Sequence, residues 1–239
     1  MRFATVVFDC DSTLTAVEGI DELAGPQRAR IEALTDEAMR GLVPLEVVYG
    51  RRLELVRPTK SRVIELGKRY IEALVPDALE TVTALRAEGI GVRIMSGGLK
   101  PAVAMLAAHL GVAEDAIDAV AVHFSEDGGY SGFDAASPLA QSGGKRTVIE
   151  SWGGRVARPL MLVGDGATDQ EAQPSVDAFV AFAGVVYRAG VVTAADVVIR
   201  ERSLAPVVPL ALGGQPPRSA AAKAIFQRGL SLLGTNPKL

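Results

Sequence analysis

The stretch "VVFDCDSTLT", residues 6 to 15, ends an apolar run with two aspartates that are one residue apart. The run is almost continuously hydrophobic from residue 3, which is typical of a strand buried on both faces of a parallel sheet. Two like charges at the end of such a strand repel each other and are costly to remove from water. Either the strand ends in solvent, or a positive group lies between Asp9 and Asp11.

Similar apolar runs recur along the chain, with helical patterns between them. The strand-like runs cover residues 3–9, 90–96, 159–165, 177–182 and 196–199. The helical patterns cover 77–89, 99–111 and 143–154, and each of them ends at a glycine. This alternation predicts an α/β fold with a doubly wound, mostly parallel, Rossmann-like sheet.

Residues 16–74 interrupt this rhythm, because they contain three helix-like stretches and no strand-like run. A helical segment directly after the first strand is expected to form a cap over the end of the sheet. Residues 123–134 contain Asp-Gly-Gly between short strand-like pieces, which predicts a hairpin. The predicted division is a catalytic core of residues 1–15 and 75–213, a helical cap of 16–74, and a linker with a short helix at 214–239. We expect a frayed terminus there, although a helix that docks on a partner or a second copy remains open.

The composition narrows the function classes. The chain has 239 residues, 49% of them hydrophobic, and a net charge of −3, so a nucleic-acid partner is not expected. No run is long enough to span a membrane, and Cys10, the single cysteine, allows no internal disulfide. These features favour a cytoplasmic location. With His109 and His123 as the only histidines, a zinc site or a Ser-His-Asp triad has little support.

Charged and small residues follow several of the predicted strands. In an open parallel sheet, ligands bind beyond the carboxyl ends of the strands, so these residues are expected at one edge. They are Asp9, Asp11, Ser96, Gly97, Gly98, Lys145, Asp165 and Asp169. Several carboxylates favour a hard cation such as Mg²⁺, and a lysine and glycine N–H groups can hold anionic oxygens. The pattern therefore predicts phosphoryl transfer, with Mg²⁺ and Lys145 offsetting the paired aspartates.

Each of these signals is weak alone. An isolated Asp-x-Asp or Ser-Gly-Gly is usually an exposed turn, and an isolated lysine is usually a solvated surface charge. However, the motifs occur in this order after strands of one type. We therefore do not expect all of them to be simple turns and surface charges. Cys10 is predicted to be a small core residue, because alternation along the strand points its side chain away from Asp9 and Asp11.

The combined motifs resemble the haloacid dehalogenase superfamily of phosphohydrolases, and more closely its phosphoserine phosphatase family. The motifs are "DCDSTLT", "SGGL", "QSGGK" and "GDGATDQEAQPSVDAFVAF", in the order and spacing of that family. The resemblance covers about residues 3 to 212. It implies Mg²⁺-dependent hydrolysis of O-phospho-L-serine through an aspartyl-phosphate, as the last step of L-serine biosynthesis.

The resemblance also implies roles for single residues. Asp9 resembles the nucleophile, and Asp11 the general acid that later activates water. Asp9, the backbone carbonyl of Asp11, and Asp165 resemble the metal ligands, with Asp169 supporting the metal shell or Lys145. The phosphoryl oxygens would be held by Ser96, Gly97, Gly98 and Lys145.

The cap is expected to select the amino-acid part of the substrate. Glu18 resembles the acid that pairs with the substrate ammonium, and Arg52 the base that grips its carboxylate. Met39 would pack beside the substrate methylene, and Thr168 matches a position near the substrate. The chain departs from the family pattern at Arg40, Leu45 and Val120, where glycine, phenylalanine and asparagine are usual.

Several alternatives stay open at this point. The departures leave room for a phosphohomoserine or phosphothreonine phosphatase, or for a phosphotransferase. A non-catalytic phospho-ligand sensor would be expected to lack Asp9 or Asp11, and a sugar-nucleotide transferase would leave Lys145 unexplained. The expected partner is a small phosphoamino acid, and the oligomeric state, including a homodimer, is open.

Overall fold

A six-stranded parallel sheet forms the centre of the computed structural model, which describes residues 1–40 and 42–234 apart from the side chains of Met39 and Leu45. The strand order is β3-β2-β1-β6-β7-β8, and each neighbouring pair is parallel. The strands are β1 (Thr5–Phe8), β2 (Gly91–Leu99), β3 (Ile117–Val120), β6 (Leu160–Gly164), β7 (Ala178–Phe182) and β8 (Val197–Ile199). The doubly wound, mostly parallel α/β fold predicted from the sequence is confirmed.

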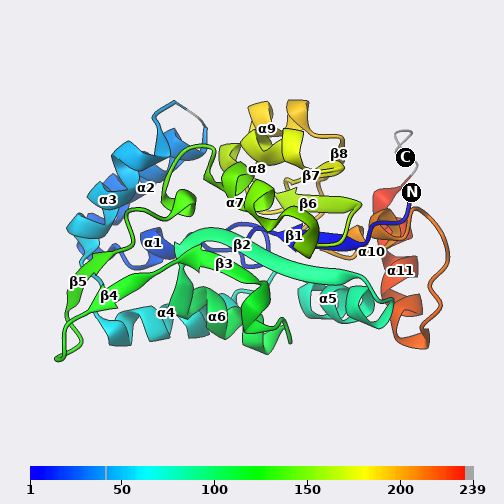
Figure 1. The fold of residues 1–239 in the computed structure, drawn as a ribbon, viewed down its shortest axis with the longest axis horizontal. Helices are drawn as coiled ribbons and strands as arrows, with labels where there is room; N and C mark the ends of the chain where they lie inside the picture. Colours follow the sequence, from blue (N-terminus) through cyan, green and yellow to red (C-terminus); the bar gives the residue numbers. More distant parts are fainter. Residues whose placement is uncertain (41, 235–239) are drawn as a thin grey trace.

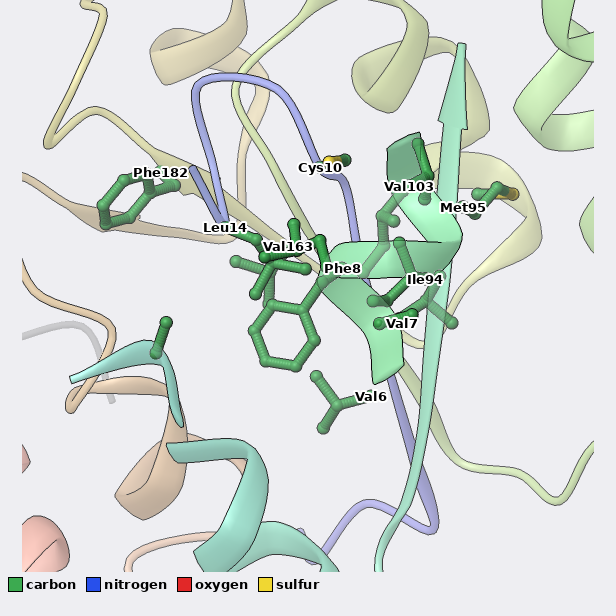
Figure 2. Packing of buried hydrophobic residues seen from close by; sticks show 14 of the residues in the cluster. Val6, Val7, Phe8, Cys10, Leu14, Ile94, Met95, Val103, Val163 and Phe182 are labelled. Carbon is green, nitrogen blue, oxygen red and sulfur yellow. The ribbon is translucent and has the colours of Figure 1, made fainter. Parts of the chain in front are cut away.

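The central strands are apolar along their whole length because both faces of the sheet are covered. Every residue of β1 and of β6 is buried. Figure 2 shows Val6, Val7 and Phe8 packing among side chains that come from several segments of the chain. A strand with no solvated face has no polar alternation, which is why the sequence shows continuous runs.

Helices cover both faces of the sheet (Figure 1). On one side lie α4 (Lys60–Glu72), α5 (Ala78–Ala87) and α6 (Lys100–His109), and on the other lie α7 (Gly144–Trp152), α8 (Ala167–Ala172) and α9 (Ala189–Ala194). The short helix α10 (Val207–Ala211) packs beside α5. In α5 the buried residues include Val82 and Leu85, whereas Leu79 is exposed.

The segment between β1 and α5 is built of helices. These are α1 (Gly19–Glu22), α2 (Arg28–Met39), α3 (Leu45–Val56) and α4. The antiparallel hairpin of β4 (Val122–Phe124) and β5 (Tyr130–Phe133) extends toward α3 (Figure 1), where the rings of Tyr49 and Phe133 lie 5.3 Å apart. Among the described helices, none is long and apolar enough to cross a membrane. The boundaries between core and cap stay a prediction.

The C-terminal segment contains the short helix expected from the sequence, but this helix is packed on the core and is not frayed. Residues Ala220–Leu233 form α11, whose first turn is capped by the Ser219 side chain. The helix packs on α5 and α10, with Ile225 and Phe226 buried. The apolar face of this helix is therefore covered by the chain's own core, so the expectation of fraying was wrong for these residues.

Candidate active site

The polar residues predicted at one edge of the sheet lie there in the structure. Asp9 follows β1, Asp165 follows β6, and Lys145 lies in the first turn of α7. The Ser96-Gly97-Gly98 segment was expected beyond its strand, but β2 continues to Leu99, with an irregular register against β3 after Ser96. These polar residues lie together because the parallel strands that precede them all end at the same edge of the sheet.

Lys145 lies between two carboxylates. Its Nζ is 2.9 Å from Asp9 Oδ2 and 2.6 Å from Asp169 Oδ1, and all three side chains are buried or nearly so. Burial alone would lower the pKa of Lys145, but Asp169 and Asp9 together raise it above its ordinary value. The lysine therefore stays charged and compensates acids that would otherwise be costly to bury.

Three carboxylates form a compact cluster. Asp9, Asp165 and Asp169 each offer an oxygen, and these oxygens all lie within 4.8 Å of one another. A set of oxygen donors at this spacing suits a hard divalent cation. Asp165 also accepts a hydrogen bond of 3.1 Å from Thr13 Oγ1 and pairs with the buried guanidinium of Arg188. The cluster fits a divalent metal, and two cations balance it when no metal is bound.

Asp11 lies outside that cluster. Its Oδ2 accepts a 2.8 Å hydrogen bond from the Gly19 N–H, and its buried Oδ1 has no hydrogen-bond partner among the described residues. Burial raises the pKa of Asp11 above its ordinary value, and the charge of Glu18 adds to the effect. An aspartate of this kind can hold a proton near neutral pH, which suits acid–base chemistry.

A pocket joins this acid cluster to the helices above it. Among the residues expected at the site, it is lined by Asp9, Asp11, Glu18, Arg52, Ser96, Gly97, Gly98, Lys145, Asp165 and Thr168. Asp169 lies behind Lys145 and is fully buried. The predicted contact of Met39 falls on a side chain outside the described structure, as does that of Leu45. The structure thus brings together most of the residues that the sequence pointed to, and their roles remain predictions.

The far end of the pocket carries a chain of hydrogen bonds that begins at Arg52. Its Nη1 donates to Thr35 Oγ1 at 2.7 Å, and that hydroxyl donates to Asp21 Oδ1 at 2.6 Å. The Arg52 guanidinium also lies 5.6 Å from the centroid of the Tyr49 ring. Burial raises the pKa of Asp21 to about 6, although the Thr35 hydrogen bond acts in the opposite direction.

Glu18 has partners of its own within the protein. Its Oε1 accepts a 2.7 Å hydrogen bond from Ser12 Oγ and lies 3.5 Å from Arg188 Nη2. Arg188 therefore touches both Glu18 and Asp165 and connects the two ends of the pocket. The place of Arg188 at the site could not be predicted from the spacing of residues after the strands, because Arg188 follows β7 by several residues.

Other residues at the site were also missed from the sequence. Asp21 carries a weak signal, since it follows Glu18 by three residues and so lies on the same side of a helical turn. Thr35 and Tyr49 carry no comparable signal. Tyr49 donates a 2.6 Å hydrogen bond to the Gly97 carbonyl and thereby holds the Ser96–Gly98 backbone.

The departures from the family pattern lie away from the pocket wall where the structure describes them. Arg40 is exposed, and its Nη1 pairs with Asp36 at 3.2 Å. Val120 is fully buried in β3. Arg40 is therefore not among the residues that line this pocket.

Cys10 lies in the hydrophobic core, as predicted (Figure 2). Its thiol nevertheless lies near Asp11 and does not point away from it, because β1 ends at Phe8 and strand alternation does not reach residue 10. Burial raises the pKa of its thiol, and the nearby Asp11 and Asp9 raise it further. A buried neutral thiol is unreactive. Its backbone N–H donates a 2.7 Å hydrogen bond to Asp9 Oδ1, so the residue helps to orient Asp9 through the main chain alone.

Comparisons with known proteins agree with this geometry. A family model described as haloacid dehalogenase-like hydrolase matches residues 6–172. The phosphoserine phosphatase of Bos taurus is 38% identical over 187 residues, which are 77% of this chain and 83% of that protein.

Solved structures show the same relationship. A phosphoserine phosphohydrolase-like protein from Francisella tularensis superposes with a TM-score of 0.77 at 25% identity, covering 84% of this chain and 96% of that one. A phosphoserine phosphatase solved as a phospho-aspartyl intermediate analogue superposes with a TM-score of 0.75 at 25% identity, covering 88% and 99%.

Proposed function

The chain belongs to the haloacid dehalogenase-like hydrolases and, within them, to the phosphoserine phosphatase family, and on this basis we propose that it hydrolyses O-phospho-L-serine to L-serine and phosphate. The resemblance seen in the motifs is confirmed by these matches. The observation that carries the proposal is the pocket that joins a buried Asp9–Lys145 pair to the Glu18 and Arg52 side chains. Such a pocket can hold a phosphoryl group at one end and a zwitterion at the other. The reaction would complete L-serine biosynthesis, and we expect it in the cytoplasm.

Asp9 is proposed as the nucleophile. One of its oxygens is held by Lys145 and the other by the Cys10 N–H, so the carboxylate is fixed before substrate arrives. A bond forms between an Asp9 oxygen and phosphorus as the bond from phosphorus to the serine oxygen breaks. The products of this step are an aspartyl-phosphate and an alkoxide that needs a proton.

Asp11 is proposed to supply that proton. Its raised pKa leaves part of the population protonated near neutral pH, and the proton passes to the serine oxygen. In the second step Asp11 takes a proton from water, which attacks phosphorus and releases phosphate from Asp9. The same group thus gives and regains one proton in a full cycle.

The developing charge on the phosphoryl oxygens requires donors and cations. We propose that the Ser96 hydroxyl, the backbone N–H groups near Gly97 and the Lys145 ammonium face these oxygens. Ser96 Oγ accepts a 2.9 Å hydrogen bond from the Gly98 N–H, which leaves its own proton free to donate. A bound Mg²⁺, held by Asp9, Asp165 and the Asp11 carbonyl with support from Asp169, would supply further positive charge at this point.

The amino-acid end of the substrate is proposed to lie between Glu18 and Arg52. A carboxylate on the protein can pair with the substrate ammonium, and a guanidinium can grip its carboxylate with two parallel hydrogen bonds. Glu18 already has Ser12 and Arg188 as partners, so substrate binding adds to an existing network instead of meeting a free charge.

A phosphate-release panel tests the function. Purified protein is assayed with O-phospho-L-serine, its D-enantiomer, phosphothreonine and phosphohomoserine, with Mg²⁺ or with EDTA. We expect the highest kcat/KM for O-phospho-L-serine, loss of turnover in EDTA, and recovery on adding Mg²⁺. A higher kcat/KM for phosphothreonine or phosphohomoserine would assign the substrate differently, and phosphate transfer to an added alcohol would indicate a transferase.

A further inference from the structure

Tyr70 lies beneath the active site, where the sequence and the proposed mechanism give it no role. It belongs to α4, is fully buried, and shares the apolar face of that helix with Val63 and Leu66. Its hydroxyl fills the space that a Cβ of Gly19 would occupy, and it lies within 3.4 Å of the point where a Cβ of Gly98 would be. The hydroxyl therefore reaches the start of α1 and the end of β2 at once.

Asp11 is the polar group that meets this hydroxyl. Its Oδ2 is taken by the Gly19 N–H, while its Oδ1 is buried without a hydrogen-bond partner among the residues described. The Tyr70 hydroxyl is likewise buried and lacks a partner in hydrogen-bond geometry. The Tyr70 hydroxyl and Asp11 Oδ2 both lie beside the point where a Cβ of Gly19 would be, so the two side chains are neighbours. Burying an unpaired carboxyl oxygen and an unpaired hydroxyl next to each other costs free energy unless the hydroxyl donates to the carboxyl.

We infer that Tyr70 is a positioning residue that donates a hydrogen bond to the Asp11 carboxyl and orients it for proton transfer. The inference rests on the proposed function, because it presupposes that Asp11 protonates the leaving group. Burial raises the pKa of the Tyr70 hydroxyl, so it keeps its proton and acts only as a donor.

The bond ties Asp11 to the helical segment above the sheet. Asp11 follows β1, whereas Tyr70 belongs to α4, which packs extensively on α6. The Tyr70 hydroxyl makes no hydrogen bond to any described residue. Catalytic hydrogen bonds are often long or poorly aligned in the free enzyme and tighten in the substrate complex. Because Tyr70 belongs to α4, the proposed bond would make the orientation of Asp11 depend on the position of that helix.

Gly19 is part of the same arrangement. Its N–H donates to Asp11 Oδ2, and its missing side chain leaves the space that the Tyr70 hydroxyl occupies beside that carboxylate. A larger residue at this position would displace Tyr70. The glycine at position 19 is thus explained by the close approach of the Tyr70 hydroxyl to its backbone, and not by an unusual backbone angle.

A leaving-group comparison separates this role from simple packing. Tyr70→Phe keeps the ring and removes only the hydroxyl. The serine oxygen needs a proton as it leaves, whereas the acetate released from acetyl phosphate does not. Because kcat/KM reports the first phosphoryl transfer, we expect a loss of about tenfold with O-phospho-L-serine. With acetyl phosphate we expect a change within about twofold.

Tyr130→Phe is the matched control. Tyr130 lies in β5, and its hydroxyl is also buried without a hydrogen-bond partner, but it lies outside the residues that line the pocket. We expect this variant to leave both substrates unchanged. A second measurement avoids acetyl phosphate altogether: adding Tyr70→Phe to Asp11→Asn should cause no further loss with O-phospho-L-serine, because the group that Tyr70 positions is already gone.

The outcomes are distinct. An equal loss on both substrates, no loss on O-phospho-L-serine, or an additive loss in the double variant would overturn the role of Tyr70. Failure of the unmodified protein to release phosphate from O-phospho-L-serine would instead reject the proposed function, and the inference with it. Thermal unfolding of each variant shows whether a loss of activity comes from a loss of fold.

Discussion

The two ends of the pocket are built differently. At the end proposed to bind phosphate, here called the phosphate end, Asp9, Asp165 and Lys145 come from segments that follow or adjoin strands of the sheet. Lys145 lies 2.9 Å from Asp9, and Asp165 pairs directly with Arg188, so these charges compensate one another. At the end proposed to bind the amino-acid part, here called the amino-acid end, Arg52 of α3 and Asp21 of α1 meet through a neutral hydroxyl, Thr35 Oγ1. The first end is a dense ion cluster, and the second is a relay of hydrogen bonds.

If the proposed function is right, this difference separates the residues that act on the phosphoryl group from those that select the rest of the substrate. An ion cluster held by a rigid sheet keeps its geometry whatever is attached to the phosphate. A relay held between helices can adjust to the remainder of the substrate, and it is energetically less costly to alter. Changes at the phosphate end should therefore affect every phosphoryl donor, and changes at the other end should affect only phosphoamino acids.

The largest effect is expected for Asp9→Asn. An amide cannot attack phosphorus, so turnover should fall by at least about a thousandfold with O-phospho-L-serine and with acetyl phosphate alike. Lys145 keeps Asp169 as a partner at 2.6 Å, so the fold should survive. Phosphate release and circular dichroism measure the two quantities.

Asp127→Asn serves as the control, since Asp127 is exposed in the hairpin turn and its hydrogen bonds go to the nearby Ser125 and Gly129. Substantial turnover by Asp9→Asn, beyond the level of contaminating wild-type protein, would remove Asp9 from the role of nucleophile.

The phosphate end was largely predictable from the sequence for a physical reason. Parallel strands buried on both faces produce continuous apolar runs, and the residues after them meet at one edge whatever lies between. Asp9, Asp165 and Lys145 could therefore be grouped without coordinates. The same reasoning placed the Ser96-Gly97-Gly98 segment at that edge, although it overlooked the continuation of β2 to Leu99.

The second largest effect is expected for Arg52→Met, which tests whether the two ends are separable. The loss of a guanidinium partner for the substrate carboxylate should raise KM for O-phospho-L-serine by about a hundredfold. The kcat/KM for acetyl phosphate, which has no such carboxylate, should stay within about twofold. Steady-state kinetics with both substrates measures the effect.

Arg51→Met is a matched control one residue away on α3, where Arg51 is exposed. If Arg52→Met lowered kcat/KM equally for both substrates, the two ends of the pocket would not act independently.

A third prediction concerns stability and pH. Burial raises the pKa of Asp21 from 3.8 to about 6, so the folded chain holds this proton more tightly than the unfolded chain does. The stability contributed by the protonated group is complete below about pH 4 and is lost as the pH rises through about 6. Glu18 and Glu32 also act to raise this pKa, while Thr35 and Arg52 act to lower it.

Asp21→Asn cannot ionise, so it removes the fall in stability at rising pH, and its amide oxygen still accepts the hydrogen bond from Thr35. Between pH 4 and pH 7 the variant should gain about 1–2 kcal/mol in its free energy of unfolding relative to the wild type. Urea unfolding of the metal-free proteins at both pH values measures the difference. An identical pH dependence in the two proteins would show that Asp21 is not protonated in this range.

The relay itself could not be foreseen from the sequence. Thr35 and Asp21 lie in separate helices, and their contact depends on how α1, α2 and α3 pack. Helix periodicity states which residues share one face, but it does not state which faces meet. Tyr70 and Arg188 were missed for the same reason, because each reaches the site from an element whose local pattern indicates only burial or a loop.

The smallest effect is expected for Thr35→Val, which removes the hydroxyl that joins Arg52 to Asp21 and keeps the branched shape. Arg52 loses one hydrogen bond in the free protein, so its guanidinium is less well oriented for the substrate carboxylate. KM for O-phospho-L-serine should rise by roughly fivefold, with kcat nearly unchanged, because the phosphate end is not touched. Thr35→Ser, which restores the hydroxyl, should recover most of the affinity. A fall in kcat without a change in KM would mean that the relay reaches the reacting atoms, and that the boundary between the two ends lies closer to Arg52 than the pocket suggests.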